Sequence, residues 1–342
     1  MKNQFINKIP FIIAEISGNH GGKISNAKKL IDLAKKGGAH AVKLQTYTAD
    51  MMTLKKNNFI IKKGIWKNSN LWELYNKAHT PLNWHKELYK YANKKRIKIF
   101  STPFSVEALN FLETLKTSIY KISSFEMNDL NLVKHIAKTK KPIIISTGLA
   151  NLKEIQETVK TAKKYGSKDI TLLYCVSNYP SSISDFNLNN LLILKKKFKC
   201  RVGLSDHSNG SQLATMSVAV GAEVIEKHIC LDKIKTVDSE FSLKGSQIKN
   251  FCLDINNAYN IIKNKKFTRS KDENENKFFR RSIYAASDIK KGDAFSANNI
   301  KTLRPSLGLS ASYYLKINNK KSPINIKKNV PLSKRLIKLL GL

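Results

Sequence analysis

The strongest constraint on the fold is a regular alternation of short apolar runs with longer amphipathic segments. Several of the amphipathic segments close on glycine, as helices often do. Eight repeats of this kind in about 260 residues predict a (β/α)8 barrel, the TIM-barrel form of the α/β class. A doubly wound open sheet is the alternative, but no G-x-G-x-x-G motif follows the first run. The eight runs are residues 11–17, 41–47, 97–104, 120–126, 142–147, 170–177, 201–208 and 223–229.

Two segments depart from the repeat. Residues 48–80 form a connection much longer than usual, so we expect a binding element or lid, with the Trp66 and Trp72 region over the barrel mouth. Residues 265–281 are polar and mixed in charge, which is typical of a linker. We therefore expect a catalytic barrel over 1–264 and a small β-rich domain with glycine turns over 282–342.

The net charge of +36 raises the question of nucleic-acid binding. Only seven of the 61 basic residues are arginine, and the lysines are scattered over helix-like segments. Because arginine is favoured in base and phosphate recognition, this composition argues against nucleic-acid binding, and we expect a field that attracts small anions.

The chain carries no sign of a membrane segment or of disulfide bonds. No stretch approaches the ~20 apolar residues of a membrane span, and no cleavage site follows the N-terminal lead, so we expect a cytoplasmic protein without a membrane partner. The four cysteines lie far apart in the sequence and are expected to be free thiols.

Polar residues stand at the C-terminal ends of all eight runs, where barrel active sites are built. Lys43 and Lys121 lie within apolar strands, where an ammonium group is costly unless an anion meets it. Together with the strand-end hydroxyl groups they favour a pocket for a phosphate or carboxylate ligand over a structural ion pair.

His207 and His228 stand at corresponding positions of the last two runs. Since neighbouring strands lie about 4.8 Å apart, the two imidazoles could share one divalent ion, with Glu15 or water completing the shell. Alternatively, each imidazole only hydrogen-bonds its neighbours. The other histidines outside the strand ends, His40, His79, His85 and His135, are expected at the surface or in packing.

Eight motifs in order across nearly the whole chain resemble the sialic acid synthase family: IIAEISGNHGG, VKLQTYTADMMT, FSTPFS, YKISSFE, PIIISTG, YCVSNYPS, GLSDHS and IEKHI. The C-terminal segment RSIYAASDIKKGDAFSANNIKTLRPSLGL resembles the antifreeze-like (SAF) domain of that family. The GIWKNSNLWELYNKAHTPLNWH insertion, the SSFE variant and TVDSEFSL resemble the branch that makes pseudaminic acid. The alternative is a branch that makes neuraminic or legionaminic acid from a manno-configured sugar.

The resemblance implies a transferase that condenses phosphoenolpyruvate with 2,4-diacetamido-2,4,6-trideoxy-L-altrose and releases phosphate. It implies a divalent metal ion, Mn²⁺, Mg²⁺ or Co²⁺, on His207 and His228. A domain-swapped homodimer is implied as well, in which Arg304 reaches the sugar in the partner subunit.

The resemblance also assigns the remaining site residues. The catalytic carboxylates would be Glu15 and Glu126. Ser177 stands where sialic acid members of the family commonly have Asn, so its contact would be shorter or bridged by water. Phosphoenolpyruvate would be bound by Lys43, Thr102, Lys121, Ser124, Ser146, Ser177 and Ser205, and the sugar by Asn178, Tyr179, Asp238 and Arg304.

Overall fold

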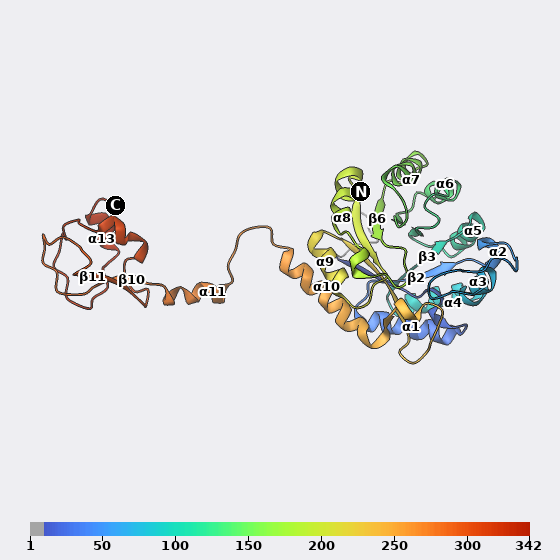
Figure 1. Ribbon diagram of the computed structural model, residues 1–342, viewed down its shortest axis with the longest axis horizontal. Coiled ribbons are helices and arrows are strands. Elements are labelled where there is room, and N and C mark those ends of the chain that lie inside the picture. The colour runs from blue at the N-terminus through green and yellow to red at the C-terminus, as the bar shows by residue number, and fades with distance from the viewer. Residues whose placement is uncertain (1–9) are drawn as a thin grey trace. The chain divides into compact units, whose positions relative to one another are not determined.

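The computed structural model describes residues 10–342 of the chain (Figure 1). Residues 1–9, the N-terminal lead, lie outside the described residues. The expected absence of a cleavage site depends partly on them. Contacts divide the chain into two units, Met1–Asn264 and Lys265–Leu342, and each is described by itself.

Eight parallel strands of the first unit close into a barrel, because β1 pairs with both β2 and β8. Closure confirms the barrel and excludes the open sheet. All eight predicted runs contain a strand. The strands are β1 (Phe11–Glu15), β2 (Ala41–Thr46), β3 (Lys98–Pro103), β4 (Tyr120–Ile122), β5 (Ile143–Ser146), β6 (Ile170–Cys175), β7 (Arg201–Asp206) and β8 (Val224–Cys230), and a two-residue β9 (Leu243–Lys244) pairs with β8.

Helices surround the barrel in Figure 1 and bury one apolar face each against the strands. In α1 the buried face is formed by Ala27, Leu30, Ile31 and Ala34, at helical spacing. The helix ends at Gly38, whose φ of 94° is left-handed and suits glycine. The surrounding helices are α1 (Ile24–Gly37), α4 (Leu82–Lys94), α5 (Val106–Thr114), α6 (Leu130–Lys138), α7 (Leu152–Lys164), α8 (Asn189–Phe198), α9 (Gln212–Val220) and α10 (Ile248–Ile262).

Strand β1 shows how the inner face of the barrel changes from apolar to polar toward its carboxyl end. On β1 the alternation of strand side chains puts Phe11, Ile13 and Glu15 on one face. Phe11 and Ile13 belong to a buried apolar cluster with residues of other barrel strands, whereas Glu15 at the strand end is polar and fully buried. The carboxyl end of the barrel is therefore where buried charge collects.

The long connection over residues 48–80 contains α2 (Ala49–Met52) and α3 (Leu71–Ala78). Trp66 packs against Tyr179 and Phe241, with ring centroids 5.5 and 6.0 Å away, and donates its Nε1 hydrogen to the Val237 carbonyl at 2.8 Å. Trp66 is therefore at the barrel mouth, as expected. Trp72 itself does not line the cavity at the mouth, although its neighbours Leu71 and Leu74 do, and its Nε1 donates a hydrogen bond to Asp50 within the connection at 2.7 Å.

The second unit has its own apolar core and little regular structure. Its antiparallel pair is β10 (Ser282–Ala285) with β11 (Ile300–Leu303), followed by α12 (Tyr314–Ile317) and α13 (Arg335–Leu339). The expected linker contains regular secondary structure: α11 (Lys271–Glu275) and a 3-10 helix over Asn276–Phe279 lie within it. Within residues 10–342, none of the helices has the length and apolar character needed to cross a membrane.

Candidate functional site

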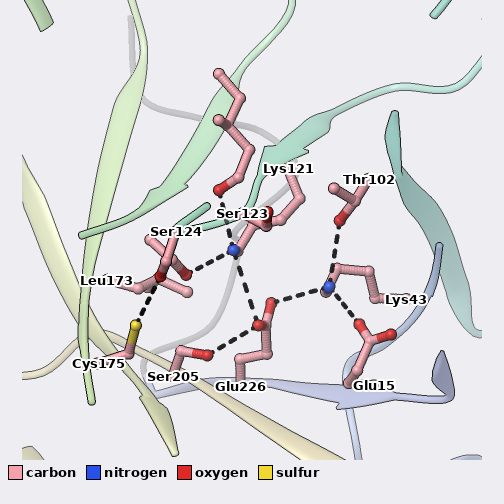
Figure 2. Close-up of polar contacts among 12 residues, drawn as sticks. Glu15, Lys43, Thr102, Lys121, Ser123, Ser124, Leu173, Cys175, Ser205 and Glu226 are labelled. Atoms are coloured by element: carbon pink, nitrogen blue, oxygen red, sulfur yellow. Dashed lines mark hydrogen bonds and ion pairs between the residues drawn. The ribbon is translucent and has the colours of Figure 1, made fainter. Parts of the chain in front are cut away.

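The carboxyl end of the barrel holds a cluster of two lysines and two glutamates, all buried (Figure 2). The Lys43 ammonium contacts the Glu15 carboxylate and lies 3.7 Å from Glu226. The Lys121 ammonium lies 3.9 Å from Glu226 and donates hydrogen bonds to Ser146 Oγ at 2.6 Å and the Ile122 carbonyl at 3.1 Å. Glu226 thus stands between the two lysines.

Hydroxyl groups complete this cluster. Lys43 donates to Thr102 Oγ1 at 3.3 Å, and Ser205 Oγ donates to Glu226 at 3.0 Å. The structure therefore brings together five predicted phosphoenolpyruvate contacts in one buried network: Lys43, Thr102, Lys121, Ser146 and Ser205.

Both lysines also have carboxylate partners within the protein, which the sequence pattern did not predict, and their binding of an anionic ligand stays a prediction. Glu226 was not among the site residues predicted from the sequence. A signal for it was available, because Glu226 and His228 are two residues apart on β8 and therefore face the same side of the strand.

Burial and charge shift the pKa values of the cluster in different directions. Burial raises the pKa of Glu15 to about 7, with Lys43 opposing and Glu226 adding to the rise. Burial disfavours ionisation of Glu226 too, but the charges of Lys121 and Lys43 outweigh it and lower its pKa. Glu226 is therefore the permanent anion of the cluster, and Glu15 can exchange a proton near neutral pH.

A second group of small polar side chains surrounds Gly148. Ser124 Oγ lies 2.9 Å from Cys175 Sγ and accepts a hydrogen bond from the Gly148 amide at 3.1 Å. A Cβ atom at Gly148 would come within 2.2 Å of Ser177 Oγ and 2.8 Å of Ser124 Oγ. Glycine is needed there because the backbone approaches these hydroxyl groups closely.

The two histidines lie side by side at the ends of β7 and β8, with ring centroids 5.4 Å apart. His207 Nδ1 donates to the Val176 carbonyl at 3.0 Å, which leaves Nε2 as a free lone pair. Burial lowers the pKa of both rings, that of His228 well below its usual value with His207 adding to the shift. Two neutral imidazoles are thus held together.

This pair fits a metal ion with two nitrogen ligands. Neutral imidazole is the form that binds metals, and His228 Nδ1 is buried with no hydrogen-bond partner in the described part of the chain. A third protein ligand is not in place: within residues 10–342 no three His, Cys, Asp or Glu side chains are grouped to hold an ion, and Glu15 is engaged by Lys43. The open positions would belong to water or substrate.

A cavity of about 480 Å³ opens beside the histidines. Its lining includes six predicted site residues: Glu126, Ser177, Asn178, Tyr179, His228 and Asp238. Burial raises the pKa of Glu126 to about 7, against the charge of Lys121. Glu126 therefore meets the cavity as a carboxyl group that can gain or lose a proton near neutral pH.

Asp238 also lines the cavity and is fixed from the β1 side. It accepts hydrogen bonds from Ser17 Oγ at 2.5 Å and the Gly18 amide at 3.2 Å. Arg304 is exposed on the second unit, before a cis peptide bond to Pro305. Apart from Arg304, all the predicted site residues lie in the barrel unit, at or near the carboxyl ends of its strands.

Comparison with known proteins adds an independent finding. Residues 30–267 match the NeuB family, and residues 280–338 match the SAF domain. The chain is 44% identical over 94% of both lengths to the pseudaminic acid synthase of Campylobacter jejuni subsp. jejuni. It is 40% identical to an N,N'-diacetyllegionaminic acid synthase of the same organism, over 90% of this chain and 94% of that protein.

A solved structure supports the same relationship. The crystal structure of an N-acetylneuraminic acid synthetase from Leptospira borgpetersenii, in complex with citrate, superposes with a TM-score of 0.71 at 32% identity. The alignment covers 79% of this chain and 90% of that one.

Proposed function

Because this chain belongs to the NeuB family, we propose that it is a pseudaminic acid synthase, condensing phosphoenolpyruvate and 2,4-diacetamido-2,4,6-trideoxy-L-altrose into pseudaminic acid and phosphate. The observation that carries this proposal is the paired lysine cluster beside two neutral histidines at the carboxyl end of the barrel, in a chain that is 44% identical to the pseudaminic acid synthase of C. jejuni.

The lysine cluster would bind the enolpyruvate anion. Lys121 is the better placed of the two lysines, since its 3.9 Å distance to Glu226 is long for a charge-assisted hydrogen bond. Ser146 and Ser205 already point their hydroxyl groups at the cluster. On binding, the phosphate and carboxylate of the substrate would take over contacts that the glutamates now make, while Ser124 and Ser177 line the neighbouring glycine turn.

His207 and His228 would hold the divalent ion, which is Mn²⁺, Mg²⁺ or Co²⁺. Among these we propose Mn²⁺, because imidazole ligands suit Mn²⁺ better than Mg²⁺. When bound, such an ion supplies a Lewis acid for the aldehyde oxygen of the open-chain sugar. The aromatic rings of Tyr179 and Phe241, which pack on the two histidines, would hold the imidazoles in place and exclude water.

The reaction joins C3 of phosphoenolpyruvate to C1 of the sugar. Water then adds at C2, and the C2–O bond breaks as phosphate leaves. Glu126 faces the cavity and Glu15 lies next to Lys43, so these two carboxyl groups would carry the proton transfers to the new hydroxyl group and from the water. Their pKa values of about 7 suit both directions of transfer.

The sugar would lie in the cavity against Asn178, Tyr179 and Asp238. We further propose a domain-swapped homodimer, in which residues 265–281 act as linker and the SAF domain, 282–342, brings Arg304 to the acetamido group in the partner barrel. The exposed position of Arg304 and the small separate core of its unit support this arrangement. A cytoplasmic location is supported by the four cysteines, all free.

The test is phosphate release from phosphoenolpyruvate with Mn²⁺ and one of three acceptors: the L-altro sugar, its D-manno counterpart or N-acetylmannosamine. We expect release with the L-altro sugar and none from a His207→Ala variant of normal thermal stability. Release with a manno acceptor alone would assign the chain to the legionaminate or neuraminate branch, and release unaffected by chelator would remove the metal from the proposal.

A further inference from the structure

A buried asparagine lies next to the site and has no part in the mechanism so far. Asn19 belongs to a 3-10 helix, Ser17–His20, that follows β1, and its side chain is fully buried. Its polar atoms reach the loop over residues 231–242, which joins β8 to β9.

The Asn19 side chain holds this loop at three points. Its Nδ2 donates to the Ile229 carbonyl at 2.9 Å, just before the loop, and to Ser242 Oγ at 2.8 Å, where the loop ends. Its Oδ1 accepts a hydrogen bond from Thr236 Oγ1 in the middle of the loop. Both amide hydrogens and the oxygen therefore take part, and one side chain joins the two ends of the loop to its centre.

The loop carries two residues of the cavity, Asp238 and Phe241. Ser242 Oγ, which Asn19 holds, donates in turn to the Asp238 carbonyl at 2.6 Å. Phe241 packs on His228, with ring centroids 4.9 Å apart. Because a backbone bond within the loop, from the Ser242 amide to the Ser239 carbonyl, is long at 3.4 Å, the side-chain contacts matter for the shape of the loop.

The same 3-10 helix also meets the loop through its first two residues. Ser17 Oγ and the Gly18 amide donate to the Asp238 carboxylate. Gly18 allows the close approach, since a Cβ atom there would come within 2.6 Å of Val237 Cγ2. The carboxylate of Asp238 is thus held independently of Asn19, whereas the backbone of the loop depends on Asn19.

Resting on the proposed function, we infer that Asn19 is a positioning residue for the acceptor sugar, which holds the 231–242 loop so that Asp238 and Phe241 meet the cavity. Asn19 does not line the cavity, so it acts through the loop and not on the substrate. Without its amide, the Ile229 carbonyl and the Thr236 hydroxyl group lose a buried partner, and the loop must move to satisfy them with water.

The first measurement needs no substrate. Hydrogen exchange of the backbone amides in residues 231–242 is followed by mass spectrometry in the native protein, Asn19→Ala and Asn26→Ala. Asn26 is the matched control: it is 5% exposed and its Nδ2 donates to the His20 carbonyl at 3.1 Å, but within residues 10–342 its side chain has no hydrogen bond to the loop. We expect exchange in the loop to be about tenfold faster in Asn19→Ala and unchanged in Asn26→Ala.

Steady-state kinetics with Mn²⁺ then measures the consequence at the site. Asn19→Ala should raise KM for the L-altro sugar about tenfold and leave KM for phosphoenolpyruvate unchanged, because the lysine cluster has no bond to the loop in the described part of the chain. Thr236→Val keeps the side-chain shape and removes only the hydrogen bond to Asn19 Oδ1. It should change both readouts in the same direction by a smaller factor, and it provides the test if Asn19→Ala does not fold.

The failures are distinguishable. Unchanged loop exchange in Asn19→Ala and Thr236→Val, or equal changes in Asn26→Ala, would overturn the hold of Asn19 on the loop, whatever reaction the protein catalyses. Faster loop exchange with an unchanged KM for the sugar would overturn the positioning role and leave the proposed function intact. Native protein that releases no phosphate with the sugar would refute the proposed function and the role of Asn19 in it.

Discussion

Two ammonium and two carboxyl groups share the buried end of the barrel, and within residues 10–342 each forms ion pairs only with members of this cluster. Removing one charge leaves its partner in low-dielectric surroundings, where the penalty reaches several kcal/mol. The largest penalty is expected at Glu226, because among the described carboxylates it alone lies within 4 Å of both lysine ammonium groups.

Glu226→Gln should therefore lower the free energy of unfolding by about 3 kcal/mol. The measurement is urea unfolding at neutral pH. Glu223→Gln is the control, because Glu223 pairs with Lys195 at 2.9 Å and Arg201 at 3.6 Å nearer the surface, where each ion pair contributes about 1 kcal/mol or less. Equal losses in the two variants would mean that the buried cluster is not electrostatically coupled.

Glu126 predicts a pH dependence of stability. Its pKa is raised from 4.5 to about 7 in the folded protein, so the folded state binds the proton more tightly than the unfolded state does. The stability that this proton contributes is fully present below pH 4.5 and is lost as the pH rises through 7.

Glu126→Gln cannot lose a proton, so it should gain stability relative to the native protein between pH 5 and pH 8, by about 1–3 kcal/mol. Chemical denaturation at several pH values measures the difference. A difference that does not change with pH would show that Glu126 is ionised throughout and cannot donate a proton at neutral pH.

At the scale of elements, the eight strands could be predicted because a parallel barrel needs buried apolar runs at regular intervals. Strand β4 is shorter than its run, since the chain leaves the sheet after Ile122 and turns, which brings Ser123 and Glu126 to the cavity. The contact of Glu226 with Lys43 was not predictable in the same way, because β8 and β2 are separated by β1 and only the side-chain conformations decide which charges meet across it.

The 48–80 connection provides a prediction at this scale. Trp66→Ala should raise KM for the sugar about tenfold, equivalent to ~1.4 kcal/mol, and leave KM for phosphoenolpyruvate unchanged. The reason is that Trp66 joins the connection to Tyr179, Phe241 and the Val237 carbonyl across the cavity. Steady-state kinetics with each substrate varied in turn gives both constants.

Trp72→Ala is the control, since Trp72 is in the same connection but binds Asp50 outside the cavity. If both variants changed both KM values equally, the effect would come from the folding of the 48–80 connection and not from the contacts of Trp66 in the cavity.

For the whole molecule, the barrel and the SAF domain each have a separate apolar core. Co-expressing His207→Ala and Arg304→Ala chains tests whether Arg304 acts in the partner barrel. Each mixed dimer would then contain one site with both residues intact, so random pairing should restore about a quarter of the native activity. Full activity of Arg304→Ala alone, or no restoration in the mixture, would contradict the swapped arrangement.

The most direct test of the central claim follows the bridging oxygen of phosphoenolpyruvate. Substrate carrying ¹⁸O between C2 and phosphorus is incubated with the L-altro sugar, Mn²⁺ and the protein, and the released phosphate is analysed by mass spectrometry. Condensation with loss of phosphate from C2 predicts that the phosphate keeps the label and that a nine-carbon keto acid forms in equal amount. Unlabelled phosphate would mean that water attacks phosphorus and not C2. Phosphate without the nine-carbon product would mean that this site does not make the carbon–carbon bond. Either result would contradict the proposed condensation.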